Sequence, residues 1–181
     1  MPIERLSVVV TRRLPKPVEA RLEELFDTTI NPDDTPMTRE ALVAAMRQTD
    51  VLVPTITDRI DAGMLGQAGD RRKLIANYGA GVDNIDVHTA RQRGILVSNT
   101  PGVLTDATAD MTMALLLSVT RRIPEGLALM HSGDWDGWSP MATLGGRLAG
   151  RSLGILGMGR IGQAIARRCH FRSRQLVGKA L

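Results

Sequence analysis

Short apolar runs alternate with amphipathic stretches along the first hundred residues of the chain. Four runs, at residues 7–10, 51–53, 74–76 and 95–97, are rich in valine, isoleucine and leucine and are bounded by polar or turn-forming positions. Runs of this length and content are typical of strands that are buried in a sheet. We therefore predict a strand at each of the four.

Stretches with helical spacing separate these runs. Helices are predicted over residues 17–25, 61–68 and 84–93. Another helix is predicted to begin after Thr38, which would be its N-cap. Either Asp83 or Asn84 could cap the last of these helices. Strands that alternate with helices form parallel sheets covered by helices on both faces. The pattern therefore predicts an α/β fold built on a doubly wound parallel sheet.

The alternation stops at the turn-forming stretch 99–102, which contains Pro101 and Gly102. We interpret this stretch as the crossing between two domains, residues 1–100 and residues 101–181. In the second domain residues 131–146 are rich in loop-forming residues, and a further strand is predicted over residues 152–156.

The second domain opens with the strongest helical pattern of the chain, over residues 106–122, with Thr105 as a plausible N-cap and Pro124 just beyond its end. Acidic residues lie in its first turns and arginines in its last, which suits the helix dipole. Residues 111–119 are apolar nearly all round the helix. A helix of this kind is expected to be buried between layers or between subunits.

The net charge of +4 is unevenly distributed. Residues 1–150 contain 16 basic and 19 acidic residues, whereas residues 151–181 contain 7 basic residues and no acidic one. A basic tail that binds anions or RNA is one interpretation of this excess. We favour another, in which the last residues belong to a domain whose continuation is missing, and we expect no nucleic-acid partner.

The single cysteine, Cys169, excludes a disulfide framework within the chain and suits a reducing compartment. The first residues have no signal-peptide pattern. No apolar run approaches the roughly 20 residues that a membrane helix needs. We therefore expect a cytoplasmic protein that has no membrane partner.

A glycine-rich stretch near the end of the chain, Gly157-Met158-Gly159-Arg160-Ile161-Gly162, lies between a predicted strand and a predicted helix. This context is the one that a dinucleotide-binding fingerprint requires. The first glycine permits the tight turn, the second lets the backbone approach a pyrophosphate, and the third lets the helix pack close to the sheet. The stretch predicts a nucleotide site, although a glycine-rich turn without a ligand has the same composition.

Two further stretches carry candidate chemistry. Residues 78–86 follow the predicted strand 74–76, and their small residues leave backbone N–H groups free to hold an anion such as a carboxylate. Residues 99–110 contain Thr108, which lies one turn into the predicted long helix and could contact a cofactor. By themselves the two stretches are equally compatible with simple turns and helix caps.

Other types of site are not supported. The three histidines, His88, His131 and His170, have no partner at the spacing of a metal site or a catalytic triad. The chain contains no pattern of a zinc site, a metalloprotease or a serine hydrolase. We expect no metal.

Together these stretches resemble the D-isomer-specific 2-hydroxyacid dehydrogenases, and the glyoxylate/hydroxypyruvate reductase branch in particular. The resemblance covers about residues 6–168. It is carried by residues 50–55, 81–86, 99–105, 108–117 and 150–166.

The resemblance implies a flavodoxin-like substrate domain in residues 1–100 and the beginning of a Rossmann NAD(P)-binding domain in residues 101–181. It implies reversible hydride transfer between NAD or NADP and a small 2-oxo or 2-hydroxy acid such as glyoxylate or hydroxypyruvate. By position, Ala80 and Gly81 hold the substrate carboxylate, and Ile56 lines the substrate pocket. Positions that contact the cofactor are Thr108, Gly157, Met158, Gly159, Arg160, Ile161 and Gly162.

The same resemblance implies a homodimer, formed through the long helix and the region of Trp135 and Trp138. It also implies a catalytic Arg, Glu and His, for which these 181 residues contain no counterpart. Only 19 residues follow Gly162, and the resemblance lapses after Arg168. We therefore expect a truncated and inactive chain that binds NAD(P)H weakly or not at all, with residues 169–181 arising from a frameshift.

Two other interpretations stay open from the sequence. A non-catalytic module would bind a carboxylate or dimerise with a longer partner. A nucleic-acid-binding protein would use its basic tail and would show binding that weakens with salt.

Overall fold

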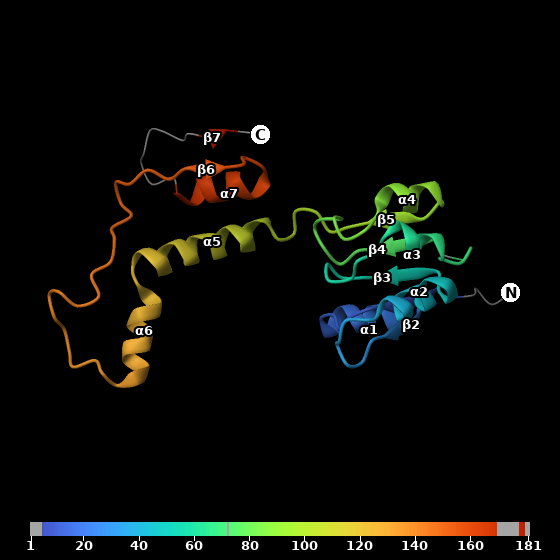
Figure 1. The fold of residues 1–181 in the computed structure, drawn as a ribbon, viewed down its shortest axis with the longest axis horizontal. Helices are drawn as coiled ribbons and strands as arrows, with labels where there is room; N and C mark the ends of the chain where they lie inside the picture. The colour runs from blue at the N-terminus through green and yellow to red at the C-terminus, as the bar shows by residue number, and fades with distance from the viewer. Residues whose placement is uncertain (1–4, 72, 170–177, 180–181) are drawn as a thin grey trace. The chain divides into compact units, whose positions relative to one another are not determined.

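The computed structural model describes residues 5–71, 73–169, 178 and 179, and it confirms the predicted α/β class (Figure 1). The chain divides into two compact units, Met1–Pro101 and Gly102–Leu181, which are described separately below. Most of the tail for which we predicted a frameshift origin, together with His170, lies outside the described residues.

A five-stranded parallel sheet forms the centre of the first unit. Its strands are β1 (Ser7–Val10), β2 (Asp27–Ile30), β3 (Val51–Val53), β4 (Leu74–Ala76) and β5 (Leu96–Ser98), in the order β2-β1-β3-β4-β5. The chain adds β2 on one side of β1 and the later strands on the other. In open α/β sheets ligands bind at the carboxyl edge, where the strand order reverses.

Helices cover both faces of this sheet. They are α1 (Lys16–Leu25), α2 (Arg39–Gln48), α3 (Ala62–Gly66) and α4 (Val87–Gln92). Successive strand residues point to opposite faces, so that Val51 and Val53 pack with Leu22 of α1 while Leu52 packs with Met46 of α2. All three residues of β3 are buried, which explains why its sequence is apolar without alternation.

Local predictions in the first unit met mixed outcomes. Thr38 caps α2 as predicted, since its hydroxyl accepts a hydrogen bond from the Ala41 N–H at 3.2 Å. The prediction of Asp83 or Asn84 as the cap of α4 is wrong, because Asp86 caps this helix and accepts from the Thr89 N–H at 2.9 Å. Strand β2 was not predicted, because Asp27-Thr28-Thr29-Ile30 is a half-polar edge strand with little apolar signal.

Asp61 joins α3 to α2 through its carboxylate. It caps α3 by accepting the Met64 N–H at 2.9 Å, and it pairs with both terminal nitrogens of Arg39 at 2.5 and 2.9 Å. The Arg39 guanidinium and then the Met64 N–H lower the pKa of the Asp61 carboxyl from 3.8 to about 2. The folded state is therefore stabilised above the ordinary pKa, and this stabilisation is lost as the pH falls through about 2.

We expect Asp61→Asn to reduce the loss of stability on acidification between about pH 4 and about pH 2. The asparagine keeps the shape of the cap but has no charge to titrate. Urea unfolding midpoints measured across this pH range would show a shallower slope than in the wild type. Arg39→Met is expected to reduce the slope in part, and a wild-type slope in Asp61→Asn would contradict the assignment.

The second unit contains α5 (Thr105–Thr120), α6 (Ile123–Ser132), β6 (Ile155–Leu156), α7 (Arg160–Cys169) and β7 (Gly178–Lys179). Strands β6 and β7 pair in parallel. Helices α5 and α7 pack side by side (Figure 1). Arg168 of α7 bonds to Asp110 at 2.6 Å and to Asp106 at 3.1 Å on α5. The two acidic residues predicted to favour the helix dipole of α5 thus also hold α7.

Two predictions for the second unit are wrong. Thr105 is the first residue of α5 and makes no capping bond; the N-cap is Leu104. The predicted helix over 106–122 ends at Thr120, and a second helix, α6, follows it. Its N-cap, Arg122, adopts a left-handed conformation with φ of 54°. Pro124, which lies just beyond the end of the predicted helix, is in the first turn of α6, where its missing N–H costs no hydrogen bond.

Among the described residues, none of the helices combines the length and the apolar character that crossing a bilayer demands.

Candidate functional site

The first candidate site lies at the carboxyl edge of the five-stranded sheet, where β3 and β4 end. Tyr78 follows β4 and donates its N–H to the carbonyl of Pro54 at 2.8 Å, so that the loops after the two strands leave the sheet side by side. The loop after β3 carries Ile56, and the loop after β4 carries Ala80 and Gly81. The structure thus brings together the three residues predicted to contact the substrate.

Three consecutive carbonyls of the loop after β4 are engaged by hydrogen bonds. The Gly79 carbonyl accepts from the Thr100 N–H at 2.9 Å, and the Ala80 carbonyl accepts from Asn99 Nδ2 at 2.7 Å. The Gly81 carbonyl accepts from Asn77 Nδ2 at 2.8 Å. Three consecutive peptide oxygens are therefore held by groups of the first unit, which fixes the conformation of the loop.

The N–H groups of Ala80 and Gly81, unlike the carbonyls of this loop, are open. Within the described residues neither N–H has a hydrogen-bond partner, and both residues are exposed. Two adjacent N–H donors on a fixed backbone form a site that suits a carboxylate or another small anion. The chemistry predicted from sequence for this loop is therefore compatible with its geometry.

Gly79 lets the two loops approach each other closely. It is buried, and a Cβ at this position would lie 2.6 Å from Cγ2 of Ile56 and 3.3 Å from Nδ2 of Asn77. The Ile56 side chain is itself 68% exposed. An exposed apolar side chain thus lies against Gly79, the residue that precedes the two open N–H groups.

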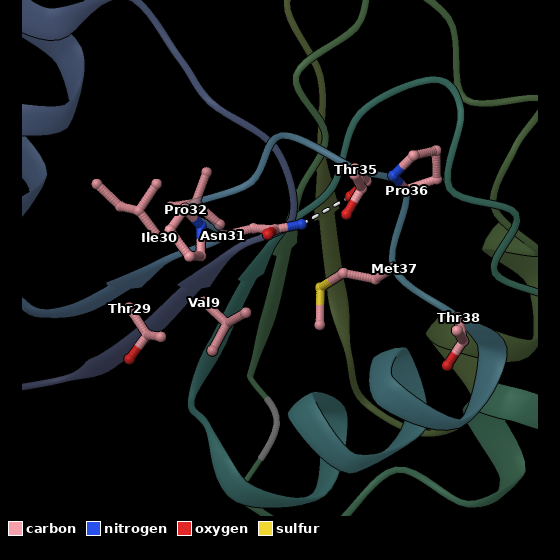
Figure 2. Close-up of a pocket in the computed structure, with 10 residues that line it drawn as sticks. Val9, Thr29, Ile30, Asn31, Pro32, Thr35, Pro36, Met37 and Thr38 are labelled. Carbon is pink, nitrogen blue, oxygen red and sulfur yellow. Dashed lines mark hydrogen bonds between the residues drawn. The ribbon is translucent and has the colours of Figure 1, made fainter.

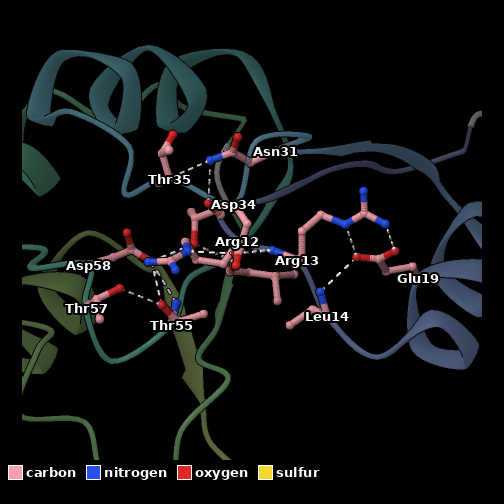
Figure 3. Close-up of polar contacts among 12 residues, drawn as sticks. Arg12, Arg13, Leu14, Glu19, Asn31, Asp34, Thr35, Thr55, Thr57 and Asp58 are labelled. Atoms are coloured by element: carbon pink, nitrogen blue, oxygen red, sulfur yellow. Dashed lines mark hydrogen bonds and ion pairs between the residues drawn. The ribbon is translucent and has the colours of Figure 1, made fainter.

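A buried carboxylate, which the sequence did not indicate, supports the loop after β3. Asp58 is 2% exposed and accepts a hydrogen bond from the hydroxyl of Thr11 at 2.5 Å. It also accepts one from the N–H of Thr55 at 2.8 Å (Figure 3). Thr11 follows β1, so that Asp58 ties the ends of β1 and β3 together. Beside this cluster, Arg12 donates to Asp34 at 2.9 Å. The available sequence signal was Thr11, a polar residue that directly follows the apolar run 7–10.

The second candidate site is the turn from β6 into α7 in the second unit. Gly157 has φ of 93°, a conformation that favours glycine. A Cβ on Gly162 would overlap the carbonyl oxygen of Gly157 and lie 3.1 Å from its carbonyl carbon. A Cβ on Gly159 would meet no atom within 4 Å. Gly157 therefore allows the turn, Gly162 allows close packing and Gly159 leaves open space. These are the three roles that the fingerprint predicts.

The other predicted cofactor positions lie in the same unit. Arg160 and Ile161 begin α7, and Met158 accepts a hydrogen bond at its carbonyl from Nε2 of Gln163 at 3.0 Å. Thr108 is exposed in the first turn of α5, and in the described part of the chain no hydrogen bond joins it to the glycine turn. A contact of these positions with a cofactor stays a prediction.

A hollow of about 390 Å³ lies elsewhere, between the carboxyl ends of β1 and β2 and the segment that precedes α2 (Figure 2). Val9, Ile30 and Met37 give it an apolar lining, and no charged side chain lines it. None of the predicted site residues lies there. The described residues also contain no cluster of three or more His, Cys, Asp or Glu side chains that could hold a metal ion.

Comparison with known proteins gives concordant results. Residues 8–173 match the family model of the catalytic domain of D-isomer specific 2-hydroxyacid dehydrogenases. The glyoxylate reductase of Thermococcus litoralis is 46% identical over 166 residues, which are 90% of this chain and 50% of that protein.

Two solved structures are similar over nearly the whole chain. A Polaromonas protein described as an NAD-binding D-isomer specific 2-hydroxyacid dehydrogenase has a TM-score of 0.86 at 40% identity, and the match covers 91% of this chain and 52% of that one. The NADPH-dependent glyoxylate/hydroxypyruvate reductase of Sinorhizobium meliloti, in complex with NADP and malonate, has a TM-score of 0.73 at 33% identity, with 91% and 50% covered. The chain spans about half the length of the relatives it matches.

Proposed function

The chain belongs to the D-isomer specific 2-hydroxyacid dehydrogenase family, and from this premise we propose that its first unit binds a small 2-oxo or 2-hydroxy acid, such as glyoxylate or hydroxypyruvate, for NAD(P)-dependent hydride transfer. The observation that carries the proposal is the pair of open N–H groups at Ala80 and Gly81, on a loop whose three carbonyls are engaged. Ile56 supplies an apolar wall beside the pair.

The ligand of one relative supports this assignment. The Sinorhizobium meliloti reductase was crystallised with malonate, a small dicarboxylate, together with NADP. A carboxylate on the Ala80 and Gly81 N–H groups would receive two hydrogen bonds from donors that need no rearrangement. The carbon chain of the acid would then lie against Ile56. A small acid fits this arrangement better than a bulky one, because Ile56 and the loop lie in contact.

The glycine turn between β6 and α7 is the proposed binding site for the pyrophosphate of NAD or NADP. The open space at Gly159 admits phosphate, and the N–H groups at the start of α7 favour negative charge. When bound, the nicotinamide cofactor would supply or accept the hydride. The proposed cofactor contacts also include Thr108, Met158, Arg160 and Ile161. The choice between NAD and NADP is left open by these residues.

We assign residues 1–100 to the substrate domain and residues 101–181 to the beginning of the cofactor domain. The family's catalytic arginine, glutamate and histidine have no counterpart in this sequence. By itself the 181-residue chain is therefore expected to bind a carboxylate without catalysing its reduction.

The proposal extends to a cytoplasmic homodimer formed through the second unit. Apolar side chains recur along the exposed side of α5 at Met111, Leu115 and Val119, which are 59–74% exposed. Trp138 is 85% exposed. An apolar helix face of this kind is energetically costly in water and is typical of an interface.

Titration of the ¹⁵N-labelled chain with oxamate, an unreactive analogue of a 2-oxo acid, tests the proposed function. We expect millimolar binding that shifts the amide signals of Ala80 and Gly81 first, because those N–H groups become hydrogen-bonded. Propanamide, which has no carboxylate, should leave them unchanged. Glyoxylate with NADH should show no loss of NADH absorbance. Absent or scattered shifts would refute the carboxylate site, and turnover would refute the predicted inactivity.

A further inference from the structure

Two asparagine side chains form a reciprocal amide pair next to the loop after β4 that carries Ala80 and Gly81, called the carboxylate loop below. Nδ2 of Asn77 donates to Oδ1 of Asn84 at 3.2 Å, and Nδ2 of Asn84 donates to Oδ1 of Asn77 at 3.2 Å. Asn77 directly follows β4 and is 2% exposed. Asn84 lies in the segment that precedes α4 and is partly buried. Each amide therefore donates one hydrogen bond to its partner's oxygen.

Each amide also holds a second segment of backbone. Nδ2 of Asn77 donates to the carbonyl of Gly81 at 2.8 Å. Nδ2 of Asn84 shares its two hydrogens among Oδ1 of Asn77 and the carbonyls of Thr55 and Asp58, the latter two each at 3.1 Å. The pair thus connects the loop that carries Ala80 and Gly81 to the loop that carries Ile56.

The backbone around Asn84 strengthens this connection. Its carbonyl accepts from the Ile60 N–H at 2.8 Å, and the Asp86 N–H donates to the Ile60 carbonyl at 2.9 Å. Asn84 is therefore fixed at its main chain to the segment that follows the Ile56 loop. Its side chain completes the link to Asn77 and to the carboxylate loop.

Only an amide meets these requirements at position 84. The side chain must donate to carbonyl oxygens and at the same time accept from Asn77. A carboxylate of the same shape has no hydrogen to donate, and its charge would face two carbonyl oxygens. A serine is too short to reach all three partners.

We propose that Asn84 is a positioning residue for the carboxylate site: through Asn77 it fixes the Gly81 carbonyl, and through Thr55 it fixes the loop of Ile56. It thereby sets the distance between the open N–H pair and the apolar wall. The inference rests on the proposed carboxylate site and adds the residue that determines its geometry. Neither amide needs to touch the substrate.

The test compares oxamate binding to the wild type, to Asn84→Asp and to Asn31→Asp by the amide shifts of Ala80 and Gly81. Asn31 is a matched control, because its amide also holds two backbone carbonyls, those of Thr11 at 2.9 Å and Thr35 at 2.7 Å, in the same unit. We expect Asn84→Asp to weaken oxamate binding at least about tenfold and to shift both amide signals in the free protein. Asn31→Asp should lower the melting temperature without either effect.

The outcomes separate the two proposals. A wild type that does not bind oxamate refutes the carboxylate site itself. A wild type that binds while Asn84→Asp binds equally well overturns the positioning role. Equal weakening in Asn31→Asp also overturns it, because the effect would then follow from lost stability. If Asn84→Asp does not fold, Asn84→Ser, which introduces no charge, is expected to show the same weakening, and unchanged binding there would be decisive against the proposal.

Discussion

Replacement of Gly162 by alanine is expected to detach the first turn of α7 from β6 and to remove nucleotide binding. The added Cβ would overlap the carbonyl oxygen of Gly157. Both atoms are held by backbone, so neither can move aside as a flexible side chain would. An overlap of this kind costs about 3 kcal/mol or more. Amide hydrogen exchange in α7 should therefore accelerate about a hundredfold.

Gly159→Ala distinguishes an effect on the fold of this turn from an effect on nucleotide binding. Its Cβ meets no atom within 4 Å, so exchange in α7 should match the wild type. The same Cβ would occupy the space through which a pyrophosphate approaches, so shifts induced by millimolar NADH should disappear. Gly154→Ala, another site with open space, serves as the control that changes neither property. Wild-type exchange in Gly162→Ala, or wild-type NADH shifts in Gly159→Ala, would contradict these assignments.

Leu115→Asp is expected to convert the proposed dimer into a monomer. Leu115 is 59% exposed at the middle of the apolar row that Met111 and Val119 complete. On the opposite side of α5, which packs on α7, Met113 contacts Cys169. In a dimer the introduced carboxylate would be buried without a partner. We expect dimerisation to weaken more than about a hundredfold.

Sedimentation of the wild type and of Leu115→Asp over a range of protein concentrations measures how far dimerisation weakens. Leu96→Asp is the matched control, because Leu96 is a 70% exposed leucine that belongs to β5 of the first unit and not to α5. It should leave the association unchanged. A monomeric wild type, or equal weakening by both variants, would exclude the exposed face of α5 as the interface.

The sequence predicted features whose cause is local. The apolar runs that form β1, β3 and β4 could be recognised from the sequence, because a strand covered by helices on both faces of a sheet contains few polar residues. The cap at Thr38 and the glycine turn at 157–162 are likewise set by residues a few positions apart. Where local signals conflicted, prediction failed: Pro124 reads equally as the end of one helix or the first turn of the next.

In the candidate site, too, features with a local cause were predicted and features that depend on distant residues were not. Its position after β4 and its small residues were readable from the sequence. Its support was not, because Asp58 acts on Thr11, 47 residues earlier, and Asn84 acts on Thr55, 29 residues earlier. Single-sequence patterns carry no record of pairs so far apart.

By itself the sequence determined the α/β class, the family, the two glycine-rich turns and the chemistry expected of each. Only the tertiary structure decided which groups of the carboxylate loop are engaged and which stay open. The physical reason is that hydrogen-bond satisfaction belongs to the packed chain. Asn77, Asn84 and Asn99 look alike in the sequence, and their common role, to hold the backbone around Ala80 and Gly81 so that its N–H groups stay open, exists only once the strands and loops have met.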